Sequence, residues 1–493
     1  MKKAVVIGAG LGGLSAAITL ASEGFQVDVV EKNRHAGGKL MPVSLLDYHF
    51  DFGPNTITMP QVFDRVFSKA GMRMSDVLNM KKLDVHTRNV FSDGTVFDFT
   101  SDSAAMKEQL QKIDPFAAQH YDAFLKEITR LYKLSETHFF PKMFESFADY
   151  LSPSLGTALL KVRPLESMHH FFGRYFKNPE LIKAFDRYAT YIGSSPYISP
   201  ATFSMIAYLE LVQGVFYAEG GNVKIAEGFK AAAEKLGVRF HFGSKVNRLQ
   251  VQNKKVSSVL LEDGRSFQAD EVIMNADLLQ AYPELVDEQH RPGFKASKRD
   301  SYQPSISAFV ILAGLKKRHR ELLHHNVFFS KDYNEEFIDL FSEQRYSSDP
   351  TIYISNSSYT DKSVSPSGDN LFILVNAPAL TREGELAADA EAYKERIYDI
   401  LEAKGLEIRN ALACERVITP LEIADTFGAY RGALYGISAN RKMDAFLRPS
   451  NFSKDIRNLS FVGGSTHPGG GSPMVTLSGM NVGEAVALRY KSS

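Results

Sequence analysis

The chain of 493 residues has one cysteine, no tryptophan and no net charge. Because Cys414 is alone, neither an intramolecular disulfide nor a zinc site made of several thiolates can form. The 57 basic and 57 acidic residues balance, so the chain has no overall attraction for nucleic acid. We therefore expect no nucleic-acid partner.

Long apolar runs are also missing. None approaches the ~18 residues of a membrane span, and the longest, residues 305–315, has the length of a buried strand. The motifs H-E-x-x-H and G-x-S-x-G are absent, and the pairs His169-His170 and His324-His325 would chelate poorly because adjacent side chains point to different faces. We expect no metal. The length favours two domains.

The N-terminal stretch MKKAVVIGAGLGGLSAAITLASEGFQVDVVEKN allows two interpretations. Two lysines before an apolar run are typical of a secretory signal. The run is divided, however: residues 4–7 predict a buried strand, G-x-G-x-x-G follows, residues 14–21 predict a helix ended by Gly24, and residues 26–30 predict a second strand. This order favours a dinucleotide-binding α/β fold over a signal peptide.

Each part of the glycine motif has a physical reason. Gly8 permits the tight turn after the strand, Gly10 and Gly12 keep side chains away from a bound diphosphate, and Gly13 lets the helix pack closely on the sheet. The helix N-terminus offers free N–H groups and a partial positive charge to the phosphates. Glu31, at the end of the second strand, would accept hydrogen bonds from a ribose hydroxyl and repel a 2′-phosphate, which argues against NADP.

A second glycine pair follows the acid. Gly37-Gly38-Lys39, shortly after Glu31 and Lys32, is similar to the E…G-G-[RK] signature of amine oxidase and carotenoid desaturase flavoproteins. Backbone N–H groups there would contact the diphosphate or ribityl part of FAD, with positive charge from Lys39 nearby. Asp51-Phe52-Gly53-Pro54 resembles a further motif of those families, where the chain passes close to the flavin. The resemblance indicates FAD rather than NAD.

Two distant segments look like further parts of the same domain. One contains predicted strands at residues 238–242 and 272–277 with a hairpin between them, and the other runs from a strand at 458–462 through a glycine-rich loop to a helix at 477–490. The expected FAD-binding domain therefore comprises residues 1–85, 215–300 and 415–493. Residues 86–214 and 301–414 would form the second, inserted domain.

Over its whole length the chain resembles the bacterial phytoene desaturase family of carotenoid desaturases and oxygenases. The motifs that carry the resemblance are GAGLGGLSAA (residues 8–17), DFGPNTITMP (51–60), YIGSSPYISPA (191–201), EGGNVKIAEG (219–228) and GGSTHPGGGSPMVTLSG (463–479). The last is more similar to GGG-x-PMVTLSG of the oxygenases of the thirty-carbon branch than to THPGAG-x-P of the desaturases.

The resemblance implies an α/β fold with a Rossmann-like FAD-binding domain of the amine oxidase and phytoene desaturase type, interleaved with an α+β domain for substrate binding and membrane association. It further implies a carotenoid substrate, peripheral attachment to the cytoplasmic face of the cell membrane, and oxygen or a quinone as electron acceptor. The favoured reaction is oxidation of a terminal methyl group of a thirty-carbon polyene to an aldehyde.

Other functions remain open from the sequence. Desaturation of the polyene is the alternative within the family. A flavin-dependent carotene isomerase or a flavoprotein without redox turnover is an alternative of a different class, and an amine oxidase would show a small aromatic cage beside the flavin.

The resemblance and the glycine motifs together predict a set of cofactor contacts. In the family, the residue matching Val246 contacts the adenine through its backbone. The expected contacts are Gly8, Gly10, Gly12, Gly13, Glu31, Lys32, Gly38, Lys39, Gly53, Pro54, Val246, Gly464 and Met474. No catalytic side chain is identified, because the chemistry is centred on the flavin; His467, in the glycine-rich loop, is a weak candidate, with a loop-stabilising hydrogen bond as its alternative role.

Aromatic residues are frequent, with 35 Phe and 21 Tyr. Phe140, Met143, Phe144, Phe147 and Leu151 recur at helical spacing, which predicts either a core-facing stripe or the wall of a tunnel for a polyene. Residues 165–175 mix aromatic and basic side chains, which suits a membrane interface or a solvated amphipathic helix.

Overall fold

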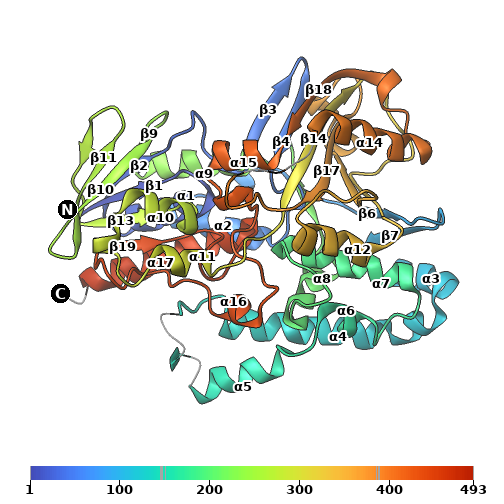
Figure 1. Cartoon of the computed structure of the whole chain (residues 1–493), viewed down its shortest axis with the longest axis horizontal. Coiled ribbons are helices and arrows are strands. Elements are labelled where there is room, and N and C mark those ends of the chain that lie inside the picture. Colours follow the sequence, from blue (N-terminus) through green and yellow to red (C-terminus); the bar gives the residue numbers. More distant parts are fainter. Residues whose placement is uncertain (1, 145–147, 150–151, 385, 387–388, 492–493) are drawn as a thin grey trace.

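The computed structural model describes residues 2–144, 148–149, 152–384, 386 and 389–491. Two sheets dominate it, and Figure 1 shows them side by side, with a group of helices beneath the second. The first sheet has five parallel strands in the order β19-β13-β1-β2-β9. Its strands are β1 (Lys3–Ile7), β2 (Gln26–Val30), β9 (Arg239–His241), β13 (Glu271–Met274) and β19 (Leu459–Phe461).

The N-terminal segment forms the predicted strand, turn, helix and strand, so the signal-peptide interpretation is wrong. Helix α1 (Leu11–Ser22) starts three residues earlier than predicted, because Gly10 already takes the N-cap position. Helix α17 (Ser472–Lys491) starts five residues before the predicted Leu477, and Pro473 fits its first turn because proline needs no hydrogen-bond partner there.

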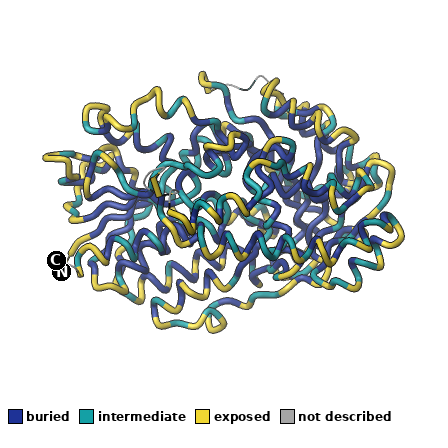
Figure 2. Tube along the Cα trace, turned by 90° about the horizontal axis from the view of Figure 1, so that it is seen from below, coloured by how far each residue is buried: buried dark blue, intermediate teal, exposed yellow. Residues whose placement is uncertain are grey.

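Helices cover the parallel sheet and leave all its strands except the edge strand β9 almost fully buried (Figure 2). α1 packs on α17, on α9 (Lys224–Lys235) and on α2 (Pro60–Lys69). The contact with α17 requires glycine, since a Cβ at Gly479 would lie 2.1 Å from the carbonyl oxygen of Gly12. A three-stranded sheet of β10 (Val246–Gln252), β11 (Lys255–Leu261) and β12 (Ser266–Phe267) follows β9.

The second sheet has seven strands in the order β18-β14-β17-β16-β15-β6-β7. All neighbours are antiparallel except β15 and β6. Its strands are β6 (Val85–Val90), β7 (Val96–Thr100), β14 (Ser307–Leu315), β15 (His325–Phe328), β16 (Ile352–Asn356), β17 (Asn370–Ala377) and β18 (Leu412–Ile418). β14 is buried throughout, which confirms the strand predicted at 305–315.

The two faces of this sheet have different neighbours. Phe309 and Ile311 of β14 pack in one cluster with Ile397 of α14 (Ala390–Ala403). Val310 and Leu312 point to the opposite face, where they pack with the hairpin of β3 (Met41–Leu45) and β4 (Tyr48–Phe52). This second face is turned toward the first sheet, so it can form one wall of a site between them.

The helical region contains most of the phenylalanine-rich core. Its main helices are α3 (Ser103–Ile113), α4 (Pro115–His138), α5 (Pro153–Lys161), α6 (Met168–Phe172), α7 (Pro179–Asp186) and α8 (Ile206–Tyr208). Fully buried rings of this region pack against one another and include Phe91, Phe97, Phe99, Phe124, Phe171, Phe172, Phe176 and Phe185. Much of the aromatic content therefore serves packing.

Smaller elements complete the chain. They are β5 (Met80–Lys82), β8 (Phe216–Ala218), α10 (Leu278–Leu285), α11 (Ala296–Asp300), α12 (Tyr333–Ile338), α13 (Ser357–Thr360), α15 (Pro420–Phe427) and α16 (Lys442–Phe446).

One expectation for the helical region is corrected. The stripe starting at Phe140 is not helical where it is described, since α4 ends at His138 and Pro141 disfavours the helical conformation just before it. Phe147 and Leu151 lie outside the described residues.

Within residues 165–175, only α6 is helical. Its Met168, Phe171 and Phe172 are buried, whereas Leu165, His170 and Arg174 are exposed. The segment therefore packs one side on the core, and its contact with a membrane stays a prediction.

The ranges expected for the two domains stay a prediction. All five strands of the parallel sheet come from residues 1–85, 215–300 and 415–493, but β6 and β18 of the second sheet cross the expected boundaries at 85/86 and 414/415. Among the described residues, no helix has the length and apolarity to cross a membrane, and no cluster of His, Cys, Asp and Glu could hold a metal ion.

Candidate functional site

A long pocket lies where four parallel strands end. The residues that directly follow β1, β2, β13 and β19 all line it: Gly8, Glu31, Asn275 and Val462. The pocket encloses about 1880 Å³ of atom-free space, part of it open to solvent. Ligands of open α/β sheets bind at this edge, because the strand-to-helix turns present their backbone groups there.

The first turn is as closely packed as the glycine motif predicts. Gly8 has a φ of +99°, and a Cβ on it would lie 2.8 Å from the carbonyl oxygen of Asn275. A Cβ on Gly10 or Gly12 would lie 2.8 or 2.7 Å from the side-chain amide of Asn275. A Cβ on Gly13 would lie 2.1 Å from the carbonyl oxygen of Gly8, so this glycine serves packing of the helix and does not line the pocket.

The N-terminus of α1 is open to an anion. Its N-cap residue, Gly10, has no side chain that could accept from the first amides, which therefore face the pocket without a capping group. Glu31 is buried, and its Oε2 and Oε1 accept from the amides of Ala9 and Asn33 at 2.7 and 2.8 Å. A carboxylate has about four acceptor positions, so this one can still accept from a ribose hydroxyl.

The second glycine pair lies directly against the first turn. Gly37 donates from its amide to the carbonyl oxygen of Ala9 at 2.8 Å, and it has a φ of +117°. Gly53, whose φ is +113°, packs on the next residues, because a Cβ there would lie 2.2 Å from the carbonyl oxygen of Lys39. The three glycine motifs of the N-terminal segment thus form one continuous surface.

The two lysines of these motifs reach across to the segment after β18. Lys39 Nζ donates to the carbonyl oxygens of Ala433 and Leu434 at 3.0 and 2.5 Å, and burial lowers its pKa to about 8. Lys32 Nζ donates to the carbonyl oxygen of Asp425 at 2.9 Å, and burial lowers its pKa as well. Both side chains line the pocket, so they bring positive charge to it.

The C-terminal loop closes the other side. Gly464 and Ser472 line the pocket, and Asp277, after β13, fixes this loop by accepting from Ser465 Oγ at 2.8 Å. The same carboxylate accepts from the amide of Tyr430 at 3.0 Å. Asp277 therefore joins the ends of two segments that lie far from it in the sequence.

The structure places the expected contacts in two groups. All of them except Gly13 and Met474 line the pocket. Met474, in the first turn of α17, packs against the core of the first sheet instead. Contact of each residue with FAD stays a prediction.

His467 lies away from the pocket lining. Its Nε2 donates to the carbonyl oxygen of Phe139 at 2.7 Å, and its ring packs edge-on to Phe144 at 4.7 Å. Burial lowers its pKa to about 4, so the ring is neutral at physiological pH. This geometry favours the loop-stabilising role over a catalytic one.

The wall opposite the glycines is apolar, and sequence reasoning missed it. Val310, Phe372 and Leu374 come from the inner face of the seven-stranded sheet, and Phe427 and Tyr435 come from the segment after it. None of these side chains is charged. The alternation of side chains along β14 could have indicated that Val310 faces a pocket. No local sequence signal shows that β17 and residues 427–435 lie next to β14.

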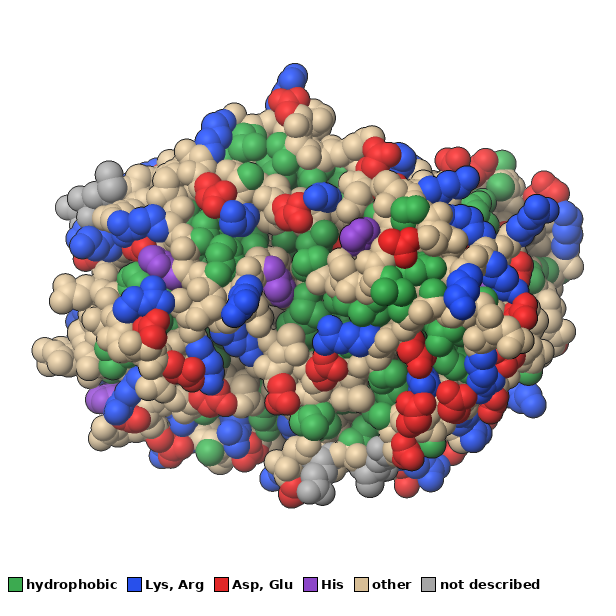
Figure 3. Space-filling view, turned by 90° about the horizontal axis from the view of Figure 1, so that it is seen from above, with side chains coloured by type: hydrophobic (Ala, Val, Ile, Leu, Met, Phe, Trp, Pro, Cys, Tyr) green, Lys and Arg blue, Asp and Glu red, His purple; other side chains and the backbone are tan. Residues whose placement is uncertain are grey.

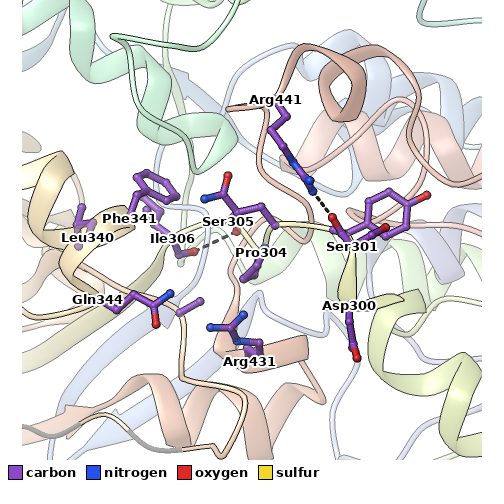
Figure 4. A pocket seen from close by; sticks show the side chains of 13 residues that line it. Asp300, Ser301, Pro304, Ser305, Ile306, Leu340, Phe341, Gln344, Arg431 and Arg441 are labelled. Carbon is purple, nitrogen blue, oxygen red and sulfur yellow. Dashed lines mark hydrogen bonds between the residues drawn. The ribbon is translucent and has the colours of Figure 1, made fainter. Parts of the chain in front are cut away.

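The space-filling view from above shows hydrophobic side chains exposed near the middle of the molecule, with histidine and charged side chains among them (Figure 3). A second pocket, which encloses about 940 Å³ of atom-free space, is separate from the first and shares no lining residue with it. Figure 4 shows its polar border, where Arg441 donates to the carbonyl oxygen of Ser301 and Arg431 lies near Asp300 and Gln344. Its arginines and its wide opening suit water better than an apolar ligand.

The sequence profile of the family described as flavin containing amine oxidoreductase matches residues 11–487. A protein of Methylomonas named 4,4'-diapolycopene oxygenase is 35% identical, over 98% of each chain. The 4,4'-diaponeurosporene oxygenase of Staphylococcus haemolyticus is 32% identical over 99% of this chain and 98% of its own. The zeta-carotene-forming phytoene desaturase of Myxococcus xanthus is 34% identical over 98% and 93%.

Solved structures agree with the fold. An oxidoreductase of Methanosarcina mazei has a TM-score of 0.61 at 16% identity and covers 98% of this chain and 100% of its own. The cyclohexylamine oxidase of Brevibacterium oxydans has a TM-score of 0.61 at 15% identity, with 99% of both chains covered. The predicted α/β fold of the FAD-binding, amine oxidase type is confirmed.

The pocket fits the cofactor, which is FAD. Glycines at which a Cβ would clash leave room for a diphosphate at the N-terminus of α1, and two half-buried lysines and the acceptor carboxylate of Glu31 line the same pocket. The N-terminal turn of α17 and the apolar wall also line this pocket, and the apolar wall suits a flat ring system.

Replacing Gly10 tests the cradle. We expect Gly10→Val to abolish FAD retention, because its Cβ would clash with Asn275 and its methyl groups would fill the diphosphate position. Flavin absorbance of the purified protein measures the effect, and circular dichroism checks that the variant is folded. Gly173→Val is the matched control, since a Cβ there would have only ordinary contacts at 3.5 Å. A folded Gly10→Val protein with full flavin content would contradict the assignment.

The lowered pKa of Lys39 gives a second prediction. We expect protonated Lys39 to attract the diphosphate. Lys39 loses its charge as the pH rises through about 8, so the dissociation constant of FAD should rise there by about tenfold. Titration of the apoprotein with FAD from about pH 6 to about pH 9.5 measures it. Lys39→Arg keeps its charge and should bind tightly throughout, whereas Lys39→Met should bind weakly without this step. If the dissociation constant of Lys39→Met rises near pH 8 by the same factor as that of the wild type, Lys39 is excluded as the titrating group.

Proposed function

Since the chain belongs to the flavin containing amine oxidoreductase family, we propose that it is an FAD-dependent carotenoid oxidoreductase that converts a terminal methyl group of a thirty-carbon polyene to an aldehyde. The observation that carries the proposal is the similarity to two oxygenases over nearly the full length of each chain. The sequence GGGSPMVTLSG at residues 469–479 favours the same reaction.

The pocket wall supports an apolar substrate. The side chains that the seven-stranded sheet contributes are Val310, Phe372 and Leu374, and none of them can form an ion pair or a hydrogen bond. An amine substrate carries a positive charge that would be costly to bury against such a wall. A hydrocarbon gains free energy from the same contacts, at about 25 cal/mol for each Å² removed from water.

The overall reaction balances with molecular oxygen as oxidant. A terminal R–CH₃ and O₂ give R–CHO and H₂O, so one oxygen atom enters the product and the other leaves as water. Bound FAD supplies the electron transfer between substrate and oxygen. The chain contributes orientation and the exclusion of water: the glycine cradle and Lys39 hold the cofactor, and the apolar wall keeps the reacting end of the polyene dry.

Desaturation is the second candidate. Relatives at 34% and 35% identity are named as desaturases, and they cover nearly the whole chain. In that reaction a CH–CH unit within the polyene would lose two hydrogens, and oxygen or a quinone would accept the electrons. A flavin-dependent isomerase would use the same pocket without net oxidation.

We further propose that the protein attaches peripherally to the cytoplasmic face of the cell membrane to collect its substrate. Leu160, Leu165 and Met443 are 78%, 76% and 63% exposed. They lie on α5, α16 and the segment between α5 and α6, near the lower edge of Figure 1, and Lys442 of α16 donates to the carbonyl oxygen of Leu165. Exposed leucines beside lysines suit a surface of anionic lipid.

Product masses test the reaction. Expression in cells that accumulate thirty-carbon carotenoids should yield a product that has gained one oxygen and lost two hydrogens. Mass spectrometry of the extracted carotenoids measures this. Products that have only lost pairs of hydrogens would instead support the desaturase, and conversion without a change of mass would support the isomerase.

Vesicle binding tests the docking surface. The FAD-loaded protein should cosediment with vesicles of phosphatidylglycerol and phosphatidylcholine, and Leu160→Asp with Leu165→Asp should weaken binding by about tenfold, because two buried leucines are lost from the contact. Leu421→Asp is the matched control, since Leu421 is 52% exposed on α15, which lies well above α5 in Figure 1. Equal losses in both proteins, or no binding of the wild type, would contradict this surface.

A further inference from the structure

A cluster of ionisable side chains is buried beside the apolar wall of the flavin pocket. It brings together residues from β6, β15, β16, the turn after α7 and the π-helical turn at Leu209–Gln213. Its members, here called the Arg187 cluster, are His86, Arg187, Tyr188, Tyr191, Glu210, His325 and Tyr353. Charged groups are costly to bury in a region otherwise rich in phenylalanine, so a ligand that uses them is a natural reason for their presence.

Arg187 is the member with unused hydrogen-bonding capacity. Its exposed fraction is 6%, and neither Nε nor Nη2 has a hydrogen-bond partner among the described residues. Nη1 makes only a long hydrogen bond, of 3.4 Å, to the hydroxyl of Tyr191. Nη2 lies 4.0 Å from Glu210 Oε2, which is an ion-pair distance without a hydrogen bond.

Glu210, in contrast, is already satisfied. Tyr188 donates its hydroxyl to Oε2 at 3.1 Å, and Tyr191 donates to Oε1. The carboxylate therefore balances the charge of Arg187 and fixes both phenols without occupying its N–H groups. Two free donors on a buried cation are expensive, at about 1 to 3 kcal/mol for each unsatisfied group, so a bound acceptor would remove a real cost.

The cluster adjoins the flavin pocket at three points. Tyr353 is the cross-strand partner of Leu374, which lines the pocket. Thr56, beside the phenols of Tyr191 and Tyr353, follows the pocket-lining Pro54 by two residues.

The third point is Tyr435, which lines the pocket and lies against the turn that follows Tyr191, since a Cβ at Gly193 would be 2.7 Å from its ring. Tyr191, Tyr353 and Tyr435 remain only half-buried, so their rings border open space rather than packed core.

We propose that Arg187 binds the oxygen atom of an oxygen-bearing end group on the polyene, an alcohol, aldehyde or carboxylate, and holds that end beside the flavin pocket. Nε and Nη2 lie on one side of the guanidinium and donate in the same direction, which is the arrangement that suits carbonyl and carboxylate oxygens. The inference rests on the proposed function. It adds that the substrate class includes polyenes already oxygenated at one end, so that an end group can be retained for further oxidation.

The absorption band of a bound polyene aldehyde tests the proposal. A hydrogen bond from a buried cation draws electron density toward the carbonyl and moves the band of the conjugated chain to longer wavelength. Under anaerobic conditions, the FAD-loaded protein is titrated with the mono-aldehyde of 4,4'-diapolycopene and, separately, with 4,4'-diapolycopene itself. We expect the red shift only for the aldehyde, and we expect Arg187→Met to remove it and to weaken aldehyde binding by about tenfold or more.

Binding of the hydrocarbon should be unchanged in Arg187→Met. If this variant fails to fold because Glu210 is left unpaired, Arg187→Met combined with Glu210→Gln removes both charges and gives the same readout. Lys394→Met is the matched control, because Lys394 is another buried cation, paired with Glu415 on the far side of the seven-stranded sheet. It should keep the red shift.

The outcomes separate the two proposals. If the wild type binds both polyenes but the aldehyde shows no shift, or keeps it in Arg187→Met, the role of Arg187 is overturned and the proposed function stands. If Arg187→Met weakens binding of both polyenes equally, Arg187 only forms a structural ion pair, and its proposed role in binding the end group is overturned too. If the wild type binds neither polyene, the proposed function itself fails.

Discussion

The site depends on one close contact, between the first glycine turn and the end of β13. Asn275 lies so near the turn that a Cβ on Gly8 would collide with its carbonyl oxygen, and a Cβ on Gly10 or Gly12 would collide with its side-chain amide. This contact leaves the amides of α1 facing an open edge. Two residues later, Asp277 holds the C-terminal loop and the segment at Tyr430, so the end of one strand determines the position of three parts of the pocket.

A second set of hydrogen bonds holds the two sheets together around the edge where the parallel strands end. Asp51, on β4, accepts from the amides of Asn222 and Val223 at 2.6 and 3.1 Å, at the start of α9. Its burial outweighs these hydrogen bonds and raises its pKa to about 6. Lys39 completes the connection by donating to carbonyl groups of the segment after β18. The apolar wall therefore faces the glycine cradle across a defined space, which suits the flat ring system of the cofactor.

Local signals in the sequence were sufficient for one side of this site. The turn at Gly8, the acid at Glu31 and the pair at Gly37 lie within a short stretch, where residue type and spacing alone determine the conformation. The opposite wall could not be predicted, because Val310, Leu374 and Tyr435 meet only through long-range strand pairing. The stripe at Phe140 misled for a related reason: its spacing is helical, but Pro141 interrupts it and the rings pack in a loop instead. The burial of Arg187 and Glu210 could not be predicted either, because single charged residues leave no periodic pattern in the sequence.

Flavin content is the measurement that tests the central claim most directly. The absorbance spectrum of the purified wild-type chain, compared with that of the cofactor released on denaturation, gives the ratio of FAD to protein. Convergence of the separated segments into one cradle predicts a yellow protein with one tightly bound FAD per chain. A folded chain that is colourless, and that takes up no FAD when the cofactor is offered in excess, would contradict it.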